Sequence, residues 1–451
     1  MKETIRIASG QGFWGDLQRA PIDQARRGPI DYLVMDYLAE VTMSIMQKQK
    51  LRNPETGYAR DFVEVVTELL PDIRDKGFRI ISNAGGVNPT ACAEAIVANA
   101  RQRGISVKVA VVTGDDLLEQ LDSLLADGVP LKHMETGAPL ADVRDRVVSA
   151  NAYLGAEPIV EALKMGADVV VTGRTTDTGL TLAPMIHEFG WDLNDWDLMA
   201  AGTIAGHILE CGAQASGGNF TDWQDVPDIA DIGFPIVEAH PDGSFIVTKH
   251  EGTGGRVSVP TVSEQLLYEI GDPKDYITPD CVADFTSIRL VPAGEDRVKV
   301  EGISGLPKTE FYKVSAAYSD GWKAAATLVY CWPDPAGKAK AAASILKKRL
   351  DALGLEFDEY RAEILGLNAL TEDERLPRSE LEEVQLRVGV RGQDREAIEQ
   401  FGREIAPLIL TGPSGVTGFA GGRPRPSEVI AYWPALIPKN RVTAEVNLLE
   451  A

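Results

Sequence analysis

The stretch Asp168-Val-Val-Val-Thr-Gly-Arg-Thr-Thr-Asp-Thr-Gly179 joins a short apolar run to a segment rich in glycine and hydroxyl groups. Three consecutive valines favour a strand, and a run without polar alternation is typical of a strand covered on both faces. Such strands belong to parallel sheets with helices on either side. We therefore expect residues 168–172 to form an inner strand of an α/β protein.

Similar apolar runs precede this one, and amphipathic segments separate them. Continuous strands that alternate with helical patterns are typical of βαβ units. The expected strands are Thr4–Ala8, Tyr32–Asp36, Phe78–Ser82 and Val107–Thr113, and the helical segments include Ala59–Lys76, Pro89–Arg103 and Ala156–Met165. The sequence predicts an N-terminal parallel sheet flanked by helices, Rossmann-like in arrangement, over residues 1–225.

The second half has a different pattern, with short strands and turns followed by two long helical segments. It predicts an α+β domain over residues 226–451. The helices are expected at Gly337–Leu353 and Asp394–Leu410, and the strands at Phe234–Ala239, Ser244–Thr248, Phe311–Tyr318, Ala324–Cys331, Val384–Val390, Val429–Tyr432 and Val442–Leu448.

The composition excludes several functional classes. The chain has 451 residues and a net charge of −22. That charge argues against a nucleic-acid or anionic-membrane partner, because phosphate groups need clustered Lys and Arg. The chain has neither an N-terminal signal segment nor an apolar run long enough to span a membrane, so a cytoplasmic protein is expected.

Polar residues follow the ends of the predicted parallel strands. Ligands of open parallel sheets bind outside these carboxyl ends, so the segments around positions 9, 83, 113 and 172 should meet along one rim. After residue 172, Arg174 and Thr176 are candidate substrate-binding residues and Asp177 is a candidate general acid or base. The alternative is an Arg–Asp ion pair with threonine caps that only holds the loop.

The segment Asn83-Ala-Gly-Gly-Val-Asn-Pro89 is a second candidate for substrate binding. Pro89 suits the first turn of a helix and Asn88 the position before it. Gly85 and Gly86 would let backbone N–H groups approach an anion at the start of that helix, beside Asn83. The same residues could equally form nothing more than a tight turn and a helix cap.

Further candidates lie in other glycine-rich or acidic segments. Asp115 follows the strand at 107–113 and could act in acid–base chemistry or cap a helix. His250 precedes Glu251, which makes it a candidate for a tunable imidazole, although a lone histidine can also be structural. The remaining substrate-binding candidates are Gln214, Asn219 and Arg256.

Standard cofactor motifs give little support for a bound cofactor. Gly10, Gly12 and Gly15 have the GxGxxG spacing, but Phe13-Trp14 puts bulk where the helix should start, so NAD is not expected. The five histidines show no HxH or HExxH spacing and the four cysteines no CxxC pair, so no metal site is expected. Coenzyme A is expected only as part of a substrate.

A late segment, Gly421-Gly-Arg-Pro-Arg-Pro426, carries two arginines in an otherwise acidic protein. Arg423 and Arg425 could clasp an anionic substrate or a coenzyme A phosphate, or they could form an oligomer contact.

Taken together, these motifs resemble the acyclic terpene utilisation AtuA family. The resemblance spans nearly the whole chain and is carried by GQGFWGD, SNAGGVNP, VVTGDD, VVTGRTTDTGLTLAP, ECGAQASGGNF, KHEGTGGRVS and GRPRPSEVIAYWP. It implies a role in catabolism, next to acyl-CoA carboxylation and β-oxidation-like steps. It also implies a reaction that adds water to, or cleaves, a branched carboxylic acid or acyl-CoA.

The hypothesis from the sequence is a lyase, a hydratase or dehydratase rather than a C–C lyase, that acts on a small anionic substrate. Asp177 would move a proton with Asp115 or His250 as its partner, while Arg174 and the Asn83–Asn88 segment bind the anionic end. A homo-oligomer is expected. The alternative is a non-catalytic binding or scaffold subunit of an acyl-CoA-metabolising complex.

Overall fold

The computed structural model describes residues 2–370, 381–417 and 422–451. The chain forms two compact units. Unit 1 comprises Met1–Ala317 and Tyr432–Ala451, and unit 2 comprises Tyr318–Ala431. These limits differ from the boundary near residue 225 expected from the sequence. Strands that follow residue 225 belong to the same sheet as the N-terminal strands.

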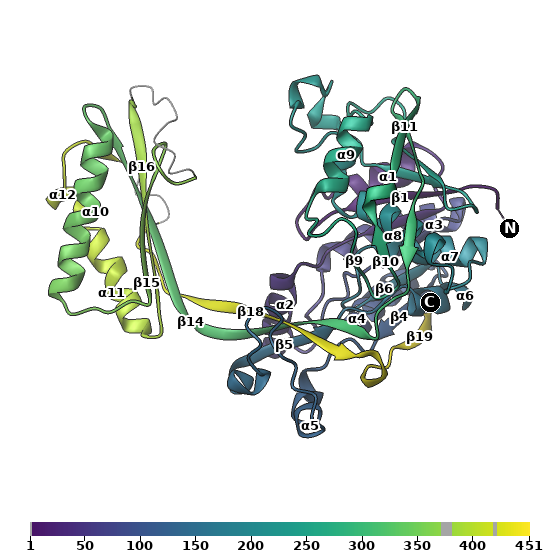
Figure 1. Ribbon diagram of the computed structural model, residues 1–451, viewed down its shortest axis with the longest axis horizontal. Helices are drawn as coiled ribbons and strands as arrows, with labels where there is room; N and C mark the ends of the chain where they lie inside the picture. The colour runs from purple at the N-terminus through teal and green to yellow at the C-terminus, as the bar shows by residue number, and fades with distance from the viewer. Residues whose placement is uncertain (1, 371–380, 418–421) are drawn as a thin grey trace. The chain divides into compact units, whose positions relative to one another are not determined.

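Unit 1 is built on a ten-stranded sheet (Figure 1). From edge to edge its strands are β11 (Arg289–Gly294), β12 (Arg297–Glu301), β8 (Phe245–Thr248), β7 (Ile236–Ala239), β1 (Ile5–Gln11), β2 (Tyr32–Met35), β3 (Arg79–Ser82), β6 (Val169–Thr172), β4 (Lys108–Thr113) and β19 (Glu445–Glu450). The five parallel neighbours β1, β2, β3, β6 and β4 are the five strands predicted for the N-terminal half. Their alternate side chains are buried on opposite faces, which explains the continuous apolar runs.

The sheet is mixed rather than parallel throughout. β7 lies antiparallel to β1 and β19 antiparallel to β4. A tight turn at Pro241-Asp-Gly243 returns the chain from β7 to β8, which also pair antiparallel. The mixed α/β architecture is thus confirmed, whereas a Rossmann-like arrangement of the N-terminal half is not established: the order β1-β2-β3-β6-β4 differs from that of the dinucleotide-binding fold.

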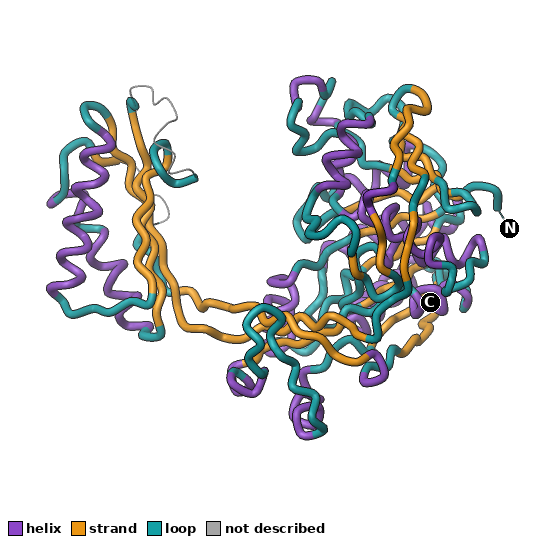
Figure 2. The backbone as a smooth tube through the Cα atoms, in the orientation of Figure 1, coloured by secondary structure: helices purple, strands orange, loops and turns teal. Residues whose placement is uncertain are grey.

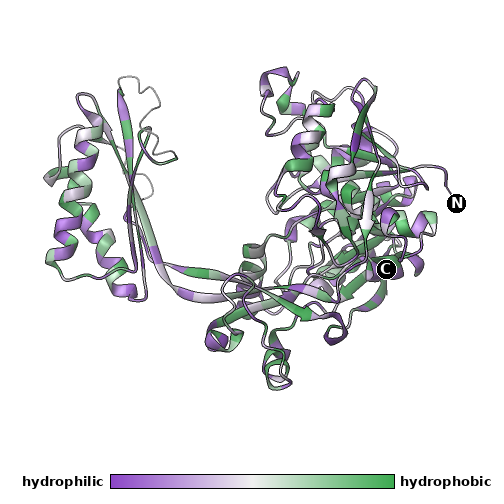
Figure 3. Ribbon diagram, viewed as in Figure 1, coloured by the Kyte–Doolittle hydropathy of each residue, from purple (hydrophilic) through white to green (hydrophobic). Residues whose placement is uncertain are grey.

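Helices cover both faces of the parallel strands and give unit 1 two apolar cores. On one face, Leu33 and Val171 pack with α1 (Ala20–Arg27), α2 (Glu40–Arg52), α3 (Arg60–Lys76) and α4 (Pro89–Arg103). On the other, Val34 and Val170 pack with α6 (Glu157–Lys164), α7 (Gly179–Phe189) and α8 (Trp196–Glu210). Figure 3 shows the hydrophobic colouring of the sheet between these helices. No helix among the described residues is both long and apolar enough to span a membrane.

The chain leaves β3 and β6 toward opposite faces, although these two strands are neighbours. The chain after β3 enters α4 on one face, while the chain after β6 enters α7 on the other. Open α/β sheets bind ligands where adjacent connections diverge in this way, outside the carboxyl ends of the strands, a position known as the strand-end crevice. The polar segments after Ser82 and Thr172 both begin there.

Smaller elements complete unit 1. Strand β5 (Val147–Ala152) pairs with β14 (Phe311–Cys331), and a three-stranded sheet has the order β13-β10-β9. The remaining bounds are α5 (Leu121–Ala126), α9 (Val259–Leu267), β9 (Tyr276–Ile277), β10 (Val282–Asp284) and β13 (Ser304–Leu306).

Unit 2 is an antiparallel sheet with helices on one face (Figure 2). Its order is β15 (Glu359–Leu365), β16 (Glu383–Gly392), β14 and β17 (Val416–Thr417), and β18 (Ser427–Pro438) also pairs with β14. The helices are α10 (Pro335–Ala352), α11 (Arg395–Ile405) and α12 (Leu408–Thr411). The predicted break between two strands at 319–323 is wrong: β14 continues through this turn-like segment, in which Gly321 adopts a φ of 84°.

Candidate active site

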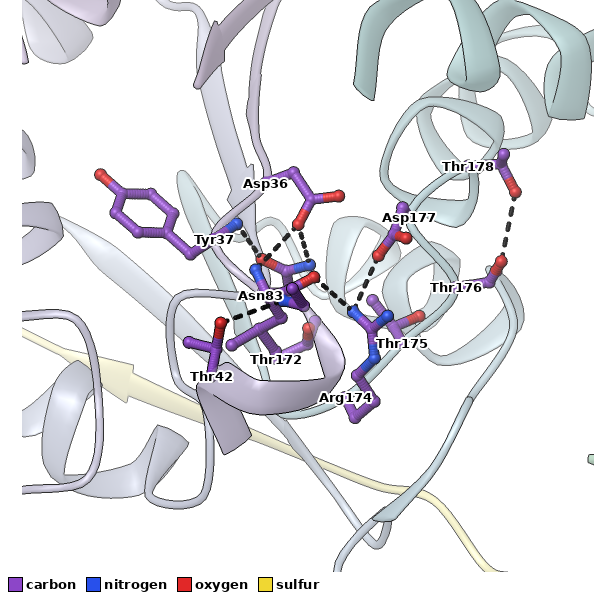
Figure 4. Close-up of polar contacts among 12 residues, drawn as sticks. Asp36, Tyr37, Thr42, Asn83, Thr172, Arg174, Thr175, Thr176, Asp177 and Thr178 are labelled. Carbon is purple, nitrogen blue, oxygen red and sulfur yellow. Dashed lines mark hydrogen bonds and ion pairs between the residues drawn. The ribbon is translucent and has the colours of Figure 1, made fainter. Parts of the chain in front are cut away.

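The ends of β2, β3 and β6 bring three polar side chains into contact in the crevice. Asn83 donates from Nδ2 to Oδ1 of Asp36 at 2.7 Å, and its Oδ1 accepts the Tyr37 backbone N–H at 2.8 Å. Arg174 donates from Nη1 to the Leu38 carbonyl at 3.1 Å. Figure 4 shows these contacts, which tie the loop after β2 to the loops after β3 and β6. The three loops therefore share one site, as the position of ligands at parallel strand ends predicts.

Arg174 is the buried centre of this site. Its side chain is 2% exposed and its Nη1 also donates to Oδ1 of Asp177 at 2.8 Å. The guanidinium lies 4.1 Å from the centre of the Tyr153 ring, a cation–π distance. Its Nε is buried and has no hydrogen-bond partner among the described residues. Because Arg174 is committed to Asp177 and Leu38, it does not present the free fork that the sequence hypothesis gave it for a substrate carboxylate.

The site holds two carboxylates in different states. Burial raises the pKa of Asp36 well above its usual range, and the nearby charge of Asp177 raises it further, against the opposing effect of Arg174 and Asn83. Asp177 is 31% exposed and forms the ion pair with Arg174. Figure 4 shows the two carboxylates close together beside Asn83 and Arg174. Burial therefore favours the protonated form of Asp36, while Asp177 forms the ion pair with the guanidinium.

A third carboxylate reaches the site from the end of α8. Burial raises the pKa of Glu210, and Asp177 is among the charges that raise it further. Glu210 Oε1 lies 2.8 Å from Nδ1 of His207, whose pKa Glu210 raises against the effect of burial. Burial, Glu210 and Asp177 also raise the pKa of Tyr276. The charge of Asp177 thus raises the pKa of both Asp36 and Glu210.

Asp115 lies below this group and joins β4 to β6. Its Oδ2 accepts the Arg174 backbone N–H at 2.7 Å and the Asn151 amide at 2.9 Å. The side chain is 3% exposed, and burial raises its pKa to about 7. Gly173 packs directly against the carboxylate, which a Cβ at that position would meet. Asp115 is therefore a buried support of the Arg174 loop rather than a partner facing Asp177.

The segment after β3 is held by packing. A Cβ on Gly85 would lie 2.5 Å from the Thr172 carbonyl, and one on Gly86 would meet the sulfur of Met46. Asn88 donates from Nδ2 to the Pro54 and Thr56 carbonyls at 2.8 Å. Gly85 therefore lets the segment after β3 approach the end of β6, whereas Gly86 lets it pack on α2. Of the residues predicted in this segment, the structure brings Asn83 into the polar group.

The loop after α8 lies next to the end of β1. A Cβ on Gly12 would lie 2.6 Å from the backbone nitrogen of Gly212, so the glycines of both segments permit their contact. Gln214 contacts Gln265 at 3.0 Å and accepts from Asn219 at 3.0 Å. Arg256 is 44% exposed and pairs with Asp225 at 3.2 Å. Thr176 contacts the Thr178 hydroxyl at 3.3 Å beside Asp177.

His250 lies away from this group. It follows β8, which is five strand positions from β6, or about 24 Å at ~4.8 Å per strand. Its Nε2 contacts the Gln24 carbonyl of α1 at 2.9 Å, and its ring packs on Gly28. Burial and the neighbouring Arg6 and Arg27 lower its pKa, which favours a neutral ring. The structure therefore does not bring His250 to Asp177.

The sequence hypothesis did not assign roles to Asp36, Tyr153, His207, Glu210 and Tyr276. Asp36 is the last residue of the second predicted strand. Its position at a strand end could therefore have identified it from the sequence as a candidate. Glu210 and His207 show no such signal, because they enter from a helix end whose position depends on long-range packing. Within residues 2–370, 381–417 and 422–451, no three His, Cys, Asp or Glu side chains gather as ligands of a metal ion would.

The fold and site define an α/β protein with coupled carboxylates and a buried arginine at the strand-end crevice. A family model described as "Acyclic terpene utilisation family protein AtuA" matches residues 5–448. The chain belongs to this family, which implies involvement in acyclic terpene utilisation. No curated protein and no solved structure matches the chain.

Proposed function

We propose that the protein is a hydratase or dehydratase acting on a small branched carboxylic acid or its acyl-CoA thioester. The observation that supports this most is the pairing of Asp36 with Asp177. The pKa of Asp36 is raised by burial and by its neighbour's charge, while Asp177 forms an ion pair with Arg174. A hydro-lyase needs such a pair, because one group must accept a proton while the other donates one.

The proposed hydration step uses both carboxyl groups. Asp177 takes a proton from a water molecule as its oxygen bonds to the β-carbon of an α,β-unsaturated acyl group. Asp36 gives its proton to the α-carbon, and the C=C bond becomes a single bond. The hydrogen bonds that Asp36 accepts from Asn83 and from the Leu38 backbone end on Oδ1, so Oδ2 is the oxygen proposed to carry the proton. Dehydration follows the same path in reverse.

Arg174 and Glu210 support this chemistry without touching the substrate. Arg174 fixes the ionised Asp177 at 2.8 Å, and its stacking on Tyr153 fixes the guanidinium itself. Asp177 also lies just before α7, where the helix dipole favours a negative charge. Glu210, coupled to Asp177, is the group proposed to exchange protons with it between turnovers.

The test is exchange with solvent deuterium. The full-length protein would be incubated in D2O with a panel of branched enoyl-CoAs and 3-hydroxyacyl-CoAs, and deuterium at the α-carbon would be followed by mass spectrometry. Asp36→Asn and Asp177→Asn should each lower the rate by about 10²-fold or more, the usual range for a lost acid or base. Asp122→Asn is the matched control, because Asp122 forms an exposed pair with Arg144 at 2.8 Å.

The competing function is a binding or scaffold subunit. Asn83 and Nη1 of Arg174 are committed to contacts within the protein, which limits the groups available to a reacting substrate and favours the scaffold alternative. A scaffold would incorporate no deuterium from any substrate in the panel. Full activity in both aspartate variants would remove Asp36 and Asp177 from the chemistry even if the wild type is active.

A further inference from the structure

The sheet of unit 2 carries a groove. It is separate from the large sheet of unit 1 and from the candidate site at that sheet's strand ends. Alternate residues of β14 and β16, such as Leu328 and Val388, are buried under α10 and α11. The residues between them point to the opposite face. There a cavity of about 700 Å³ is lined by strands β14, β15, β16 and β18.

The floor of the groove is made of small side chains. Ala325, Gly389 and Ala431 lie in it, together with Val429. A Cβ on Gly389 would have no neighbour closer than 4.0 Å, so the glycine leaves the floor open and flat rather than filling a crowded position. A flat apolar surface of this kind suits a planar ring.

The rim of the groove is cationic. Lys323, Arg361, Arg391 and Arg425 line it, against one lining carboxylate, Glu359. Arg391 is already held by Glu359 at 2.8 Å and by Asp320. Arg361 is 79% exposed and lies 3.7 Å from Glu363, a carboxylate that Arg387 also binds. An exposed pair of this kind leaves most of the arginine's charge available.

The other two cations of the rim, Lys323 and Arg425, are more available to a ligand than Arg361. Lys323 and Arg425 are exposed, and neither side chain forms a hydrogen bond or ion pair with the described residues. Arg425 belongs to the arginine segment that stood out in the sequence; residues 418–421, just before it, lie outside the described residues. Three available cations around one small cavity are unusual in a chain of net charge −22.

We propose that this groove binds a nucleotide-like ligand, with its planar base on the Ala325–Gly389 floor and its phosphate groups on Lys323, Arg361 and Arg425. Arginine binds phosphate through two parallel hydrogen bonds and also stacks on planar rings, so both parts of such a ligand have a matching surface. Free nucleotides and the nucleotide portion of coenzyme A share this chemistry. The inference does not depend on the hydro-lyase proposed at the crevice.

The test is calorimetric titration of the full-length protein with coenzyme A, ADP and inorganic phosphate. Coenzyme A or ADP should bind, and inorganic phosphate should bind at least tenfold more weakly because it does not use the floor. Arg361→Gln and Arg425→Gln should each weaken nucleotide binding about tenfold, the loss expected for one charge-assisted contact. Raising the salt concentration should weaken binding as well.

Two controls show whether the groove itself holds the ligand. Arg403→Gln changes an exposed arginine of α11, which pairs with Glu399 at 2.8 Å and lies outside the groove, and should leave binding unchanged. Asp36→Asn and Asp177→Asn should also leave it unchanged, so loss of the proposed chemistry and loss of the groove are distinguishable. Absent binding, equal affinity for inorganic phosphate, or groove variants that change only the oligomeric state would each overturn the proposal.

Discussion

Three aspartates of unit 1 show how burial decides what one residue type can do. Asp177 is partly exposed beside Arg174, Asp36 is buried next to that pair, and Asp115 is buried under the backbone of the same loop. The same carboxyl group therefore forms an ion pair, has a raised pKa through burial, or accepts a backbone hydrogen bond at three neighbouring places. Only the tertiary environment separates these roles.

The raised pKa of Asp115 predicts a pH-dependent stability. Its pKa is about 7 in the folded protein and about 3.9 when unfolded. Below about pH 4 both states are protonated. As the pH rises from about 4 to about 7, the unfolded chain releases the proton first, so stability falls, and the full penalty is reached above about pH 7.

Asp115→Asn removes this titration and keeps an oxygen for the Arg174 N–H. The difference in free energy of unfolding between the variant and the wild type should increase in favour of the variant, by up to about 4 kcal/mol, as the pH rises from about 4 to about 8. Urea denaturation at several pH values measures the difference. Parallel pH curves for the two proteins would contradict a raised pKa at this position.

At this scale, the sequence predicted which strand-end residues lie together at the candidate site. Asn83, Arg174 and Asp177 follow apolar strands, and strand-end residues of parallel neighbours must lie together. The partner of Asp177 was not found in this way. Asp115 and His250 have the expected side chains, but burial under Gly173 and packing on Gly28 direct them elsewhere. Local sequence carries no information about those contacts.

At the scale of elements, the contact between the loops after β3 and β6 depends on Gly85. Its φ is not in the left-handed region, so a change at this position tests packing rather than backbone strain. A Cβ there would lie 2.5 Å from both the Thr172 carbonyl and the Pro89 side chain. Backbone and proline cannot move aside as a flexible side chain can.

Gly85→Ala should therefore lower the free energy of unfolding by about 2 kcal/mol, within the range for overpacked sites, and should reduce any activity of the crevice. Gly271→Ala is the matched control, because a Cβ on Gly271 would meet nothing within 4 Å. Chemical denaturation of both variants gives the comparison. Equal stability of the two would show that the loops can separate at little cost.

Element boundaries were predicted well where the local pattern was strong. The helix predicted at 89–103 matches α4, and the five parallel strands lie close to their expected positions. By contrast, β14 was divided in two because Ser319-Asp-Gly321 has the composition of a turn. Pairing with β16 begins at Trp322, directly after this segment, and β18 also pairs with β14, so the strand stays continuous. A tertiary partner here overrides the local preference.

At the scale of the whole molecule, unit 2 is an insertion in unit 1. The chain leaves unit 1 at Ala317 on β14 and returns at Tyr432 on β18, and these two strands pair. The Lys439 N–H donates to the Glu310 carbonyl at 2.9 Å, which fixes their antiparallel register. The two ends of the insertion therefore lie on adjacent strands.

Replacing residues 318–431 by a short Asn-Gly turn should leave unit 1 folded, because such turns close two-residue hairpins. The shortened protein should keep a cooperative thermal transition and the solvent-exchange activity proposed for the crevice, while losing the binding of ADP. Circular dichroism and the deuterium assay measure these outcomes. An unfolded product would mean that unit 1 needs unit 2 to reach its structure.

Sequence patterns could not predict this connectivity. The strands of residues 236–301 were assigned to a second domain, yet they extend the first sheet, and β19 completes its opposite edge. Strand periodicity reports burial but not the partner strand. Pairings between distant segments are fixed only when the whole chain has folded.

The place of β19 has a consequence for biosynthesis. Residues 445–450 pair with 108–113, so this edge of the apolar strand β4 stays unpaired until residues 445–450 have left the ribosome. A nascent chain that stops early exposes that edge, and unpaired edges recruit other strands. Truncated translation products should therefore aggregate even when every residue of the crevice has already been made.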